Sequence, residues 1–429
     1  MVVGGGNVPD CKTINTFRSE RMKDIILDVF SEVVELLIDQ KYIKLENYFL
    51  DGTKIEANAN KYSWVWGKST KRYKEKLREK CTELFAVAEL INQQENEDYG
   101  NENLEELGTD KPIDSQVIEE AVKRIDEKLA ANPTDKKLQK AKKTIETDYL
   151  PRMKKYEHQE ELLAERNSYS KIDTDATFMR MKEDHMKNGQ LKPGYNVQIG
   201  PENQFVVGFS VQQDAGDTRC MKEHFEELKQ ELGGRLPGNV VADAGYGSEE
   251  NYEYLKEAEL GNYVKYNTFH KEASRQWKND VTRVQNWAYN EETDEYICGC
   301  GRILRFQYER SQKSKNGYQS TVRVYESGDC SGCPHRDRCV KSSDPDANRR
   351  IYINRRGNEL KAEARANLTS EYGRQMRSLR PIEVESVFGN IKGNFGMRRF
   401  TLRGMAKVKL EWGLHCIAHN MRKMAAANG

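Results

Sequence analysis

The stretch NYFLDGT, residues 47–53, decides the fold of this chain. Its apolar residues 48–50 predict a buried strand, and Asp51 follows them directly. An Asp-Gly pair such as Asp51-Gly52 is typical of a turn. A carboxylate where a buried strand ends is also typical of a ligand site in an α/β sheet. The stretch alone leaves both interpretations open, so the remaining sequence must distinguish them.

A second stretch, VVADAGYG at residues 240–247, has the same pattern. An apolar run leads to Asp243, and small residues follow. Two strand-end aspartates from distant parts of one sheet can lie side by side and share a hard cation, since Mg²⁺ prefers oxygen ligands. Two such ions about 3.5–4 Å apart are suited to cutting phosphodiesters. The pair Asp51 and Asp243 therefore predicts a metal site.

A predicted helix, PIEVESVFGNIKGNF at residues 381–395, offers a third carboxylate. Glu385 shares a partly apolar face with Phe388, and we expect this face to pack on a sheet. A carboxylate there is costly unless it is paired or binds a metal. Lys392 follows at a spacing that suits a phosphate contact. Rival acids in loop-like contexts are Asp173, Asp175, Asp214 and Asp217.

Bulk properties are typical of a protein of several domains without a membrane span. The 429 residues are 32% charged, and we find no run of about 18 apolar residues or more. We read no secretory signal at the start. Nine cysteines, an odd number, favour a reducing cytosol over a disulfide framework. The net charge of +1 is unevenly distributed, because residues 91–120 carry −9 and residues 341–429 carry +10. The basic part predicts a phosphate-binding surface, with a solvated face as the alternative.

The periodicity predicts an α/β chain with two insertions. Residues 68–170 have the pattern of charged helices around an acidic loop at 92–115, and residues 270–350 are expected to be irregular and rich in cysteine. A hairpin is predicted at 194–213, in one sheet with Asp51. The expected divisions are 1–45, helical; 46–67 and 171–269, the sheet core; 68–170, the helical insertion; 270–350, the cysteine-rich insertion; and 351–429, the helix of Glu385 with basic helices.

Four segments together resemble the DDE transposases of bacterial insertion sequences, whose catalytic core is RNase H-like. They are FLDGTKIEANANKY (49–62), DTDATFMRMKEDHMKNGQLKPGYNVQIG (173–200), VVADAGYGSEENY (240–252) and RPIEVESVFGNIKGNFGMRRF (380–400). The resemblance extends from about residue 9 to the end of the chain. It implies that Asp51, Asp243 and Glu385 form a catalytic triad that binds Mg²⁺ or Mn²⁺.

The resemblance also implies a fold and a reaction. The fold would be an RNase H-like mixed sheet flanked by helices. The reaction would be cleavage of double-stranded DNA at transposon ends and strand transfer to target DNA. We expect a homodimer or larger assembly on DNA, and a location in the bacterial cytosol, on the nucleoid when DNA-bound and away from membranes.

One family signature is only half present. Members often carry Tyr-x2-Arg-x3-Glu-x6-Lys, and Glu385 and Lys392 fit its second half. Ser378 and Pro381 occupy the Tyr and Arg positions, so Arg380 or Arg377 would have to substitute. The residues expected to contact DNA are Lys392, Arg380, Arg398, Arg399 and Arg403.

The cysteine pairs YICGCG and CSGC predict a structural zinc site. Related transposases carry a similar cysteine set, and free thiols in a reducing cell are the alternative. The preferred ligands are Cys298, Cys330, Cys333 and Cys339, with Cys300 and His335 in reserve.

Relatives usually have a helical N-terminal domain ahead of PDCKTINTFR (9–18), so we expect this chain to lack most of it. The alternative functions follow from these features. One is a truncated, catalytically silent DNA-binding regulator of transposition. The other is a zinc-dependent interaction module without nuclease activity, in which the three acids would lie far apart.

Overall fold

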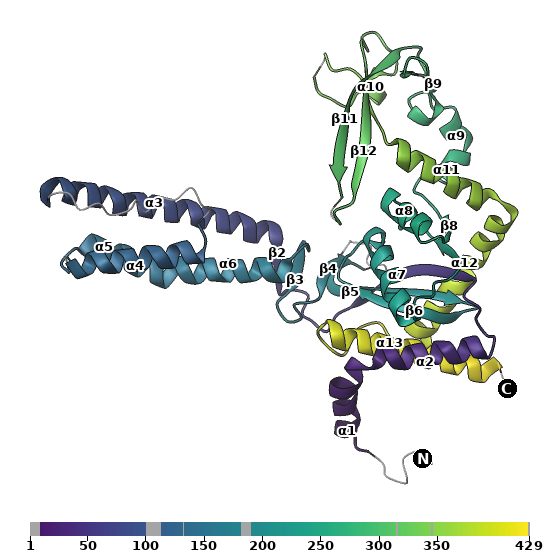
Figure 1. The fold of residues 1–429 in the computed structure, drawn as a ribbon, viewed down its shortest axis with the longest axis horizontal. Coiled ribbons are helices and arrows are strands. Elements are labelled where there is room, and N and C mark those ends of the chain that lie inside the picture. The colour runs from purple at the N-terminus through teal and green to yellow at the C-terminus, as the bar shows by residue number, and fades with distance from the viewer. Residues whose placement is uncertain are drawn as a thin grey trace. The chain divides into compact units, whose positions relative to one another are not determined.

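The computed structural model describes residues 9–99, 113–131, 133–181, 190–314, 316–344 and 346–427. The chain divides into two compact units (Figure 1). The first unit consists of residues 1–58, 180–190 and 194–429, and the second of residues 59–179 and 191–193. Among the described residues, the helices are all too short or too polar to cross a membrane.

A mixed sheet lies at the centre of the first unit (Figure 1). Five of its six strands, in spatial order, are β6 (Phe205–Gln212), β5 (Leu191–Glu202), β1 (Asn47–Glu56), β7 (Asn239–Ala242) and β8 (Gly261–Val264). β1 runs antiparallel to β5 and parallel to β7, and β7 runs parallel to β8. The predicted hairpin at 194–213 is confirmed as β5 and β6, and it shares this sheet with Asp51.

Strand β1 does not end at Asp51, so the prediction of a strand end there is wrong. The parallel pairing stops at Leu50 opposite Ala242, but the antiparallel pairing with β5 continues from Asp51 to Glu56. Gly52 lies within this strand, not in a turn. A Cβ added at Gly52 would stand 2.4 Å from Nε2 of Gln198. The glycine therefore serves close packing between strands.

Helices cover the sheet of the first unit. They include α2 (Ile26–Asp39), α7 (Cys220–Glu231), α8 (Glu249–Glu257), α11 (Arg355–Thr369), α12 (Glu371–Gly389) and α13 (Met405–Ala427). The final helix α13 packs on β6 and α2, whereas α12 contacts β1 and β7 (Figure 1). Short elements precede α2, namely α1 (Cys11–Thr16), η1 (Phe17–Arg21) and η2 (Met22–Asp24). The mixed sheet with covering helices confirms the α/β class.

The core beneath the sheet is built around Tyr48. Its hydroxyl lies 2.5 Å from Nε2 of His224, whose Nδ1 lies 2.8 Å from the Ser210 hydroxyl. Burial lowers the pKa of His224 to about 3, so this imidazole hydrogen-bonds as a neutral ring. Gly200 and Gly208 face the same tyrosine, and a Cβ on Gly200 would stand 1.7 Å from Cζ of Tyr48. The two glycines make room for the buried ring.

Residues 270–350 are not irregular, so that prediction is wrong. They contribute to a five-stranded antiparallel sheet of β9 (Ala288–Asn290), β10 (Glu295–Ile297), β11 (Ile303–Lys313), β12 (Gln319–Ser327) and β13 (Arg350–Ile353). Short helices accompany it, including η5 (Lys271–Ala273), α9 (Arg275–Lys278), η6 (Val284–Asn286) and α10 (Arg336–Cys339). In β11 only Leu304 is buried, so this strand lacks the alternation that marks a half-buried strand.

Helix α12 begins at Glu371, well before the predicted start near residue 380. The Ser370 side chain caps it by accepting a hydrogen bond from the Gly373 N–H, at 2.9 Å. Pro381 lies inside the helix, although a proline there removes one backbone hydrogen bond. After Gly389 the chain continues as a π-helical turn, η7 (Asn390–Asn394).

The second unit is largely helical and has a core of its own. Its elements are β2 (Trp64–Trp66), α3 (Gly67–Tyr99), α4 (Ser115–Ala131), α5 (Lys136–Thr144), η3 (Ile145–Tyr149), α6 (Leu150–Leu163), β3 (Ser168–Ser170) and β4 (Thr177–Arg180). Because α3 extends to Tyr99, the loop predicted at 92–115 is wrong for residues 92–99, and residues 100–112 lie outside the described residues. The proposed domain boundaries stay a prediction.

Candidate active site

The register of the central sheet brings Asp51 and Asp243 together. Leu50 of β1 pairs with Ala242 of β7, and each aspartate is the next residue along its parallel strand. One nitrogen of the Arg380 guanidinium, Nη2, lies 3.1 Å from Oδ1 of Asp51 and 3.8 Å from Oδ2 of Asp243. The two carboxylates therefore flank a single positive group.

The oxygens of this pair have the chemistry of a hard-cation site. The Gly52 N–H donates to Oδ1 of Asp51 at 2.9 Å, and the Gly245 N–H donates to Oδ1 of Asp243 at 2.8 Å. The Asp51 side chain is 16% exposed and that of Asp243 is 41% exposed, so the site opens on the Asp243 side. The guanidinium nitrogen lies where a cation shared by both aspartates would be attracted. The carboxylate oxygens are ligands that suit Mg²⁺ or Mn²⁺.

Asp217 is a further acid at this site. It lies in η4 (Asp217–Arg219), after β6, which runs in the same direction as β1. A Cβ on Gly245 would stand 2.9 Å from Oδ1 of Asp243 and 3.5 Å from Oδ2 of Asp217. A Cβ on Gly52 would stand 2.9 Å from Oδ1 of Asp217. The sequence predicts Asp217 only as a rival acid. Because the predicted hairpin makes β6 parallel to β1, an acid that follows β6 can be expected at the same edge of the sheet as Asp51.

Two further groups near the aspartates have shifted pKa values. Burial raises the pKa of Tyr246 well above its usual range, and Asp217, Asp51 and Asp243 add to the effect. The Tyr246 hydroxyl donates to the Gln198 side chain. Burial lowers the pKa of Lys265, and the neighbouring Arg380 lowers it further. The site therefore combines a protonated phenol with the guanidinium of Arg380.

Glu385 does not lie on a buried helix face, so that prediction is wrong. Glu385 is exposed on α12, and Ile382 one turn before it is 55% exposed. Glu383 is the buried glutamate, and it accepts a hydrogen bond from the Gln204 N–H at 2.5 Å. Burial raises the pKa of Glu383. A catalytic role for Glu385 stays a prediction, since its helix position alone supports it.

Lys392 and Arg380 extend from the α12–η7 segment toward β1. The Lys392 ammonium donates to the Thr53 hydroxyl at 2.6 Å. Thr53 is two residues after Asp51, so both side chains project from the same face of the strand. The segment that carries Glu385 is thus attached at two points to the strand that carries Asp51.

The other predicted DNA contacts lie between η7 and α13. Arg398, Arg399 and Arg403 are all exposed. Nε of Arg399 donates to the Ala57 carbonyl at 3.2 Å, and Nε of Arg403 donates to the Asn58 carbonyl at 2.7 Å. Each bond uses one nitrogen of a guanidinium that carries five N–H donors. The bonds hold these arginines near the end of β1, and their DNA contacts stay a prediction.

The cysteine-rich region brings five sulfurs to one small cavity of about 20 Å³. Lining it are the four preferred ligands Cys298, Cys330, Cys333 and Cys339, together with the reserve Cys300. His335 does not line it, but its backbone N–H lowers the pKa of Cys333. Burial raises the pKa of Cys300 to about 11.

Neither set of residues forms a finished metal centre. Within the described part of the chain, no group of three or more His, Cys, Asp or Glu side chains is arranged to hold a metal ion. Zinc binding by the cysteines is therefore not confirmed, and the triad of Asp51, Asp243 and Glu385 stays a prediction. What the structure does bring together is the pair of aspartates, Asp217 beside them and Arg380 between them.

Comparison with known families identifies the C-terminal part of the chain. Residues 297–425 match the family model for the transposase DDE domain, a range that includes Glu385 and Lys392 but neither aspartate. No curated protein and no solved structure matches the chain. Bacterial origin and a missing N-terminal domain stay predictions. By this match, residues 297–425 are similar to the DDE domain of transposases, a family whose substrate is DNA.

Proposed function

We propose that the protein cleaves DNA strands at transposon ends and transfers them to target DNA, using Asp51, Asp243 and Glu385. The observation that carries this proposal is the register of β1 and β7, which sets the two aspartates side by side with Arg380 between them. The match to the transposase DDE domain supplies the class of substrate. A module without nuclease activity would not require this pairing of acids.

The order of the central strands supports an RNase H-like core. Five of the six strands, β1, β5, β6, β7 and β8, lie in the order 3-2-1-4-5 when numbered along the sequence. The first three are successively antiparallel, and the last two run parallel to the first. The first strand is central and carries Asp51. The fourth lies beside it and leads to Asp243. Ligand sites in such sheets form where neighbouring strands of one direction end.

Asp51 and Asp243 would bind divalent ions, with Glu385 as the third acid and Asp217 close by. When bound, Mg²⁺ or Mn²⁺ would activate water and stabilise the leaving oxygen of a phosphodiester. The protein itself contributes position and charge, as in other phosphoryl transfers. Lys392 is held by Thr53 on the strand of Asp51, where its ammonium can contact a phosphate. Strand transfer joins both ends of a transposon to one target DNA, so we propose a dimer or larger assembly on DNA.

The test is a cleavage and strand-transfer assay with Mg²⁺ on the terminal DNA of the element that encodes the protein. We expect Asp51→Asn, Asp243→Asn and Glu385→Gln each to reduce cleavage by about 10²–10³-fold or more, because each removes a charged ligand. Circular dichroism and thermal melting would show that the variants fold.

Glu383→Gln is the matched control on the same helix. Its amide oxygen can still accept the Gln204 N–H, so we expect cleavage to be kept. If Glu383→Gln and Glu385→Gln reduce DNA cleavage equally, the assignment of Glu385 as the third catalytic acid is contradicted. A wild-type protein that binds the DNA without cutting it would favour the silent regulator instead.

We also propose that the cysteine cavity binds a structural Zn²⁺. The support is that five cysteines from two separated stretches line one cavity of ion-like size. As the sulfurs lie, no three are arranged as a metal site, so binding would draw them together. Zinc content measured by mass spectrometry should be about one per chain and should fall in Cys330→Ser. Cys416→Ser, at an isolated buried thiol, is the control. Wild-type protein purified without zinc, and unable to bind it, would refute the proposal.

A further inference from the structure

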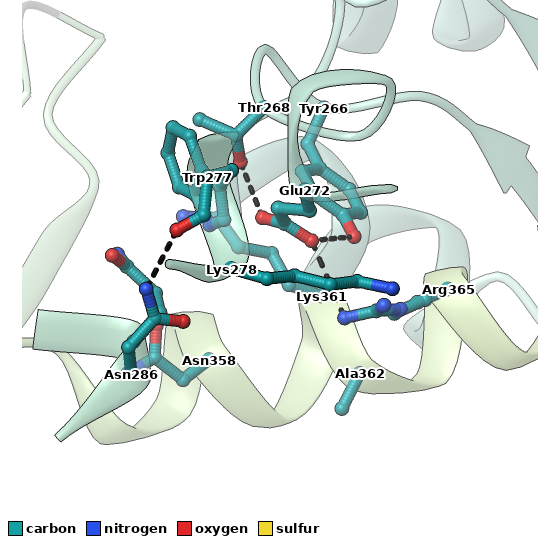
Figure 2. A pocket seen from close by; sticks show the side chains of 11 residues that line it. Tyr266, Thr268, Glu272, Trp277, Lys278, Asn286, Asn358, Lys361, Ala362 and Arg365 are labelled. Carbon is teal, nitrogen blue, oxygen red and sulfur yellow. Dashed lines mark hydrogen bonds and ion pairs between the residues drawn. The ribbon is translucent and has the colours of Figure 1, made fainter. Parts of the chain in front are cut away.

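A surface cavity of about 350 Å³ lies beside helix α11 (Figure 2), and neither Asp51 nor Asp243 lines it. One wall is α11 itself, which presents Asn358, Lys361, Ala362 and Arg365 at helical spacing. The opposite wall is the segment that follows β8, from Tyr266 to Asn286. The buried positions of α11 lie elsewhere on the helix, so this polar face is not needed for the core.

The cavity has a surplus of positive charge. Its lining includes three basic residues, Lys278, Lys361 and Arg365, and one acid, Glu272. Glu272 accepts hydrogen bonds from Tyr266 at 2.8 Å, from Thr268 at 2.5 Å and from Arg365 at 3.3 Å (Figure 2). The one carboxylate is therefore already satisfied by the protein.

The two lysines of the cavity are exposed and have no acidic partner among the residues that the structure describes. The acids of α11 do not neutralise Lys361. Glu363 pairs with Lys256 at 2.7 Å, and Glu359 lies 3.3 Å from Arg356. Two exposed lysines thus line one cavity.

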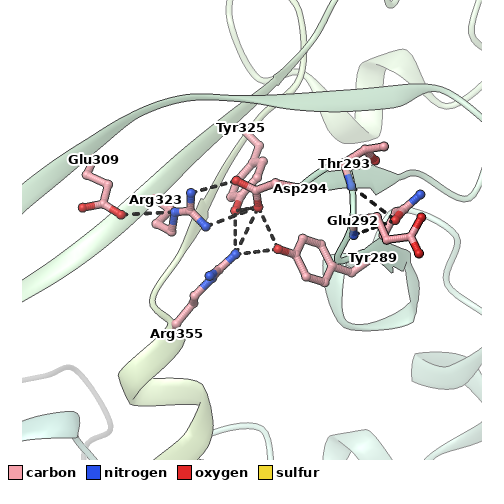
Figure 3. Close-up of polar contacts among 9 residues, drawn as sticks. Tyr289, Glu292, Thr293, Asp294, Glu309, Arg323, Tyr325 and Arg355 are labelled. Carbon is pink, nitrogen blue, oxygen red and sulfur yellow. Dashed lines mark hydrogen bonds and ion pairs between the residues drawn. The ribbon is translucent and has the colours of Figure 1, made fainter.

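A larger cavity nearby, of about 580 Å³, shows what a self-contained network looks like. There Arg323 and Arg355 both pair with Asp294, at 2.7 and 3.0 Å (Figure 3). Arg356 pairs with Glu253 at 2.7 Å. These arginines already have carboxylate partners, so this region stabilises the fold and has little charge left for a ligand. The cavity beside α11 differs in that its lysines have none.

The chemistry of the cavity favours a phosphate over a base. Trp277 forms part of the lining but is only 9% exposed, and the Arg283 guanidinium already lies 4.2 Å from its ring centre. It is therefore poorly placed to stack on a nucleobase. The amides of Gln285 and Asn358 are exposed at the lining and can donate hydrogen bonds. Cations with neutral donors are the groups that contact phosphate oxygens in DNA complexes.

The cavity is connected to the candidate active site by shared elements. Its wall begins just after β8, next to the strand that leads to Asp243. Arg377 of α12 lies over the Phe269 ring in that same wall, at 5.1 Å, and Arg380 is one helical turn further on. A DNA strand held at the cavity would therefore be held by the elements that carry the catalytic groups.

We propose that this cavity binds a backbone phosphate of the DNA substrate, through Lys278, Lys361 and the neighbouring amides. The inference rests on the proposed function for its ligand, because DNA is the polymer that supplies the phosphodiester. The site is separate from the two aspartates, and a phosphate contact there does not depend on the base sequence of the DNA. It adds affinity and holds the duplex in register.

The test measures DNA affinity at several salt concentrations, by fluorescence anisotropy with a duplex of arbitrary sequence. EDTA in the buffer separates binding from cleavage. The double variant Lys278→Gln/Lys361→Gln should bind about tenfold more weakly, and the slope of log K against log salt should become shallower by about 0.9 per lost phosphate contact. The matched control is Lys222→Gln/Lys229→Gln, two exposed lysines on α7 that should leave the slope unchanged.

Unchanged affinity and slope in the cavity variant would overturn the proposal. The proposal would also be overturned if the wild-type protein bound a free mononucleotide and the variant lost this binding but kept its affinity for DNA. The cavity would then bind a small ligand and not DNA. Different results would refute the two proposals. If the wild-type protein cleaves DNA but the salt slope of the double lysine variant is unchanged, only the phosphate site is refuted. If the variant has a shallower slope but the wild-type protein does not cleave DNA, only the proposed catalysis is refuted.

Discussion

At the scale of single residues, Arg380 occupies the position of most consequence. It was predicted to contact DNA, yet its guanidinium lies between Asp51 and Asp243. Neither Nε nor Nη2 of this arginine makes a hydrogen bond among the described residues, so its contacts with the aspartates are ionic. A divalent ion would compete with this guanidinium for the same oxygens.

We therefore expect Arg380→Gln to bind Mg²⁺ more tightly than wild type in the absence of DNA. Removing the competing charge should raise the affinity about tenfold, equal to ~1.4 kcal/mol. Isothermal titration calorimetry measures the change. Arg377→Gln, three residues away on the same helix, is the control. Weaker Mg²⁺ binding in Arg380→Gln would mean that the arginine supports the metal site.

Glu231 is a second residue with a measurable consequence. Burial raises its pKa from 4.5 to about 7, although Lys409 lowers it. Its Oε1 is buried without a hydrogen-bond partner among the described residues. Between pH 4.5 and 7 the folded protein holds a proton that the unfolded chain releases. Stability should therefore fall as pH rises through this window, by at most about 1.4 kcal/mol per pH unit.

Glu231→Gln should flatten this part of the stability profile, because the amide does not titrate. Thermal melts across the pH window would show it. Glu227→Gln is the control, since Glu227 is a partly exposed acid that pairs with Lys409 at 2.8 Å. If Glu231→Gln and wild type lose stability in parallel as pH rises, the assignment to Glu231 is wrong.

At the scale of elements, the sequence predicts the chemistry of β1 better than its geometry. The apolar run before Asp51 predicts the strand and the carboxylate, but the Asp-Gly pair predicts a turn where the strand continues. The glycine is required by side chains on β5, a strand far away in sequence. Close packing of this kind leaves no local pattern. The same holds for α12, where Pro381 lies inside a helix that earlier residues begin.

The contact between Gly200 and Tyr48 gives a prediction at this scale. Gly200→Ala would place a methyl group 1.7 Å from Cζ of a fully buried ring, so we expect a loss of about 3 kcal/mol or more. Gly389→Ala is the control. Gly389 lies in a helix with open space around it, so alanine should raise the free energy of unfolding by about 0.5–1 kcal/mol. Urea unfolding measures both. Similar midpoints for the two variants would contradict the packing argument.

At the scale of the whole molecule, the sequence predicts a helical insertion and a cysteine-rich insertion but not a second sheet. Exposed strands such as β11 bury too few side chains to leave a periodic pattern. The candidate site is predictable in part for the same reason. Asp51 and Asp243 follow buried strands and are visible as motifs. The sequence predicts Arg380 as a DNA contact and Asp217 as a rival acid, but their places beside the two aspartates depend on tertiary packing.

The second unit should fold without the first. Its helices enclose a core of their own, made of Leu77, Cys81, Phe85, Ile118, Ala121, Ile125, Leu138, Ile145 and Met153. Residues 59–179 expressed alone should therefore show helical circular dichroism and a cooperative thermal transition. Ile125→Asp, which buries an unpaired carboxylate, should abolish the transition. A fragment that is helical but melts without cooperativity would count against an independent unit.

The pairing of Glu56 with Gly194 has a consequence for the order of folding. Closing β1 onto β5 spans residues 57–193, and each doubling of a loop costs about 0.6 kcal/mol of entropy. Within the second unit, however, Trp64 pairs with Ser170. Once that pair has formed, the open loop consists only of residues 57–63 and 171–193. This loop is about one quarter as long, so the entropic cost of closing it is lower by ~1 kcal/mol. Early formation of the helical unit would thus speed assembly of the strand that carries Asp51.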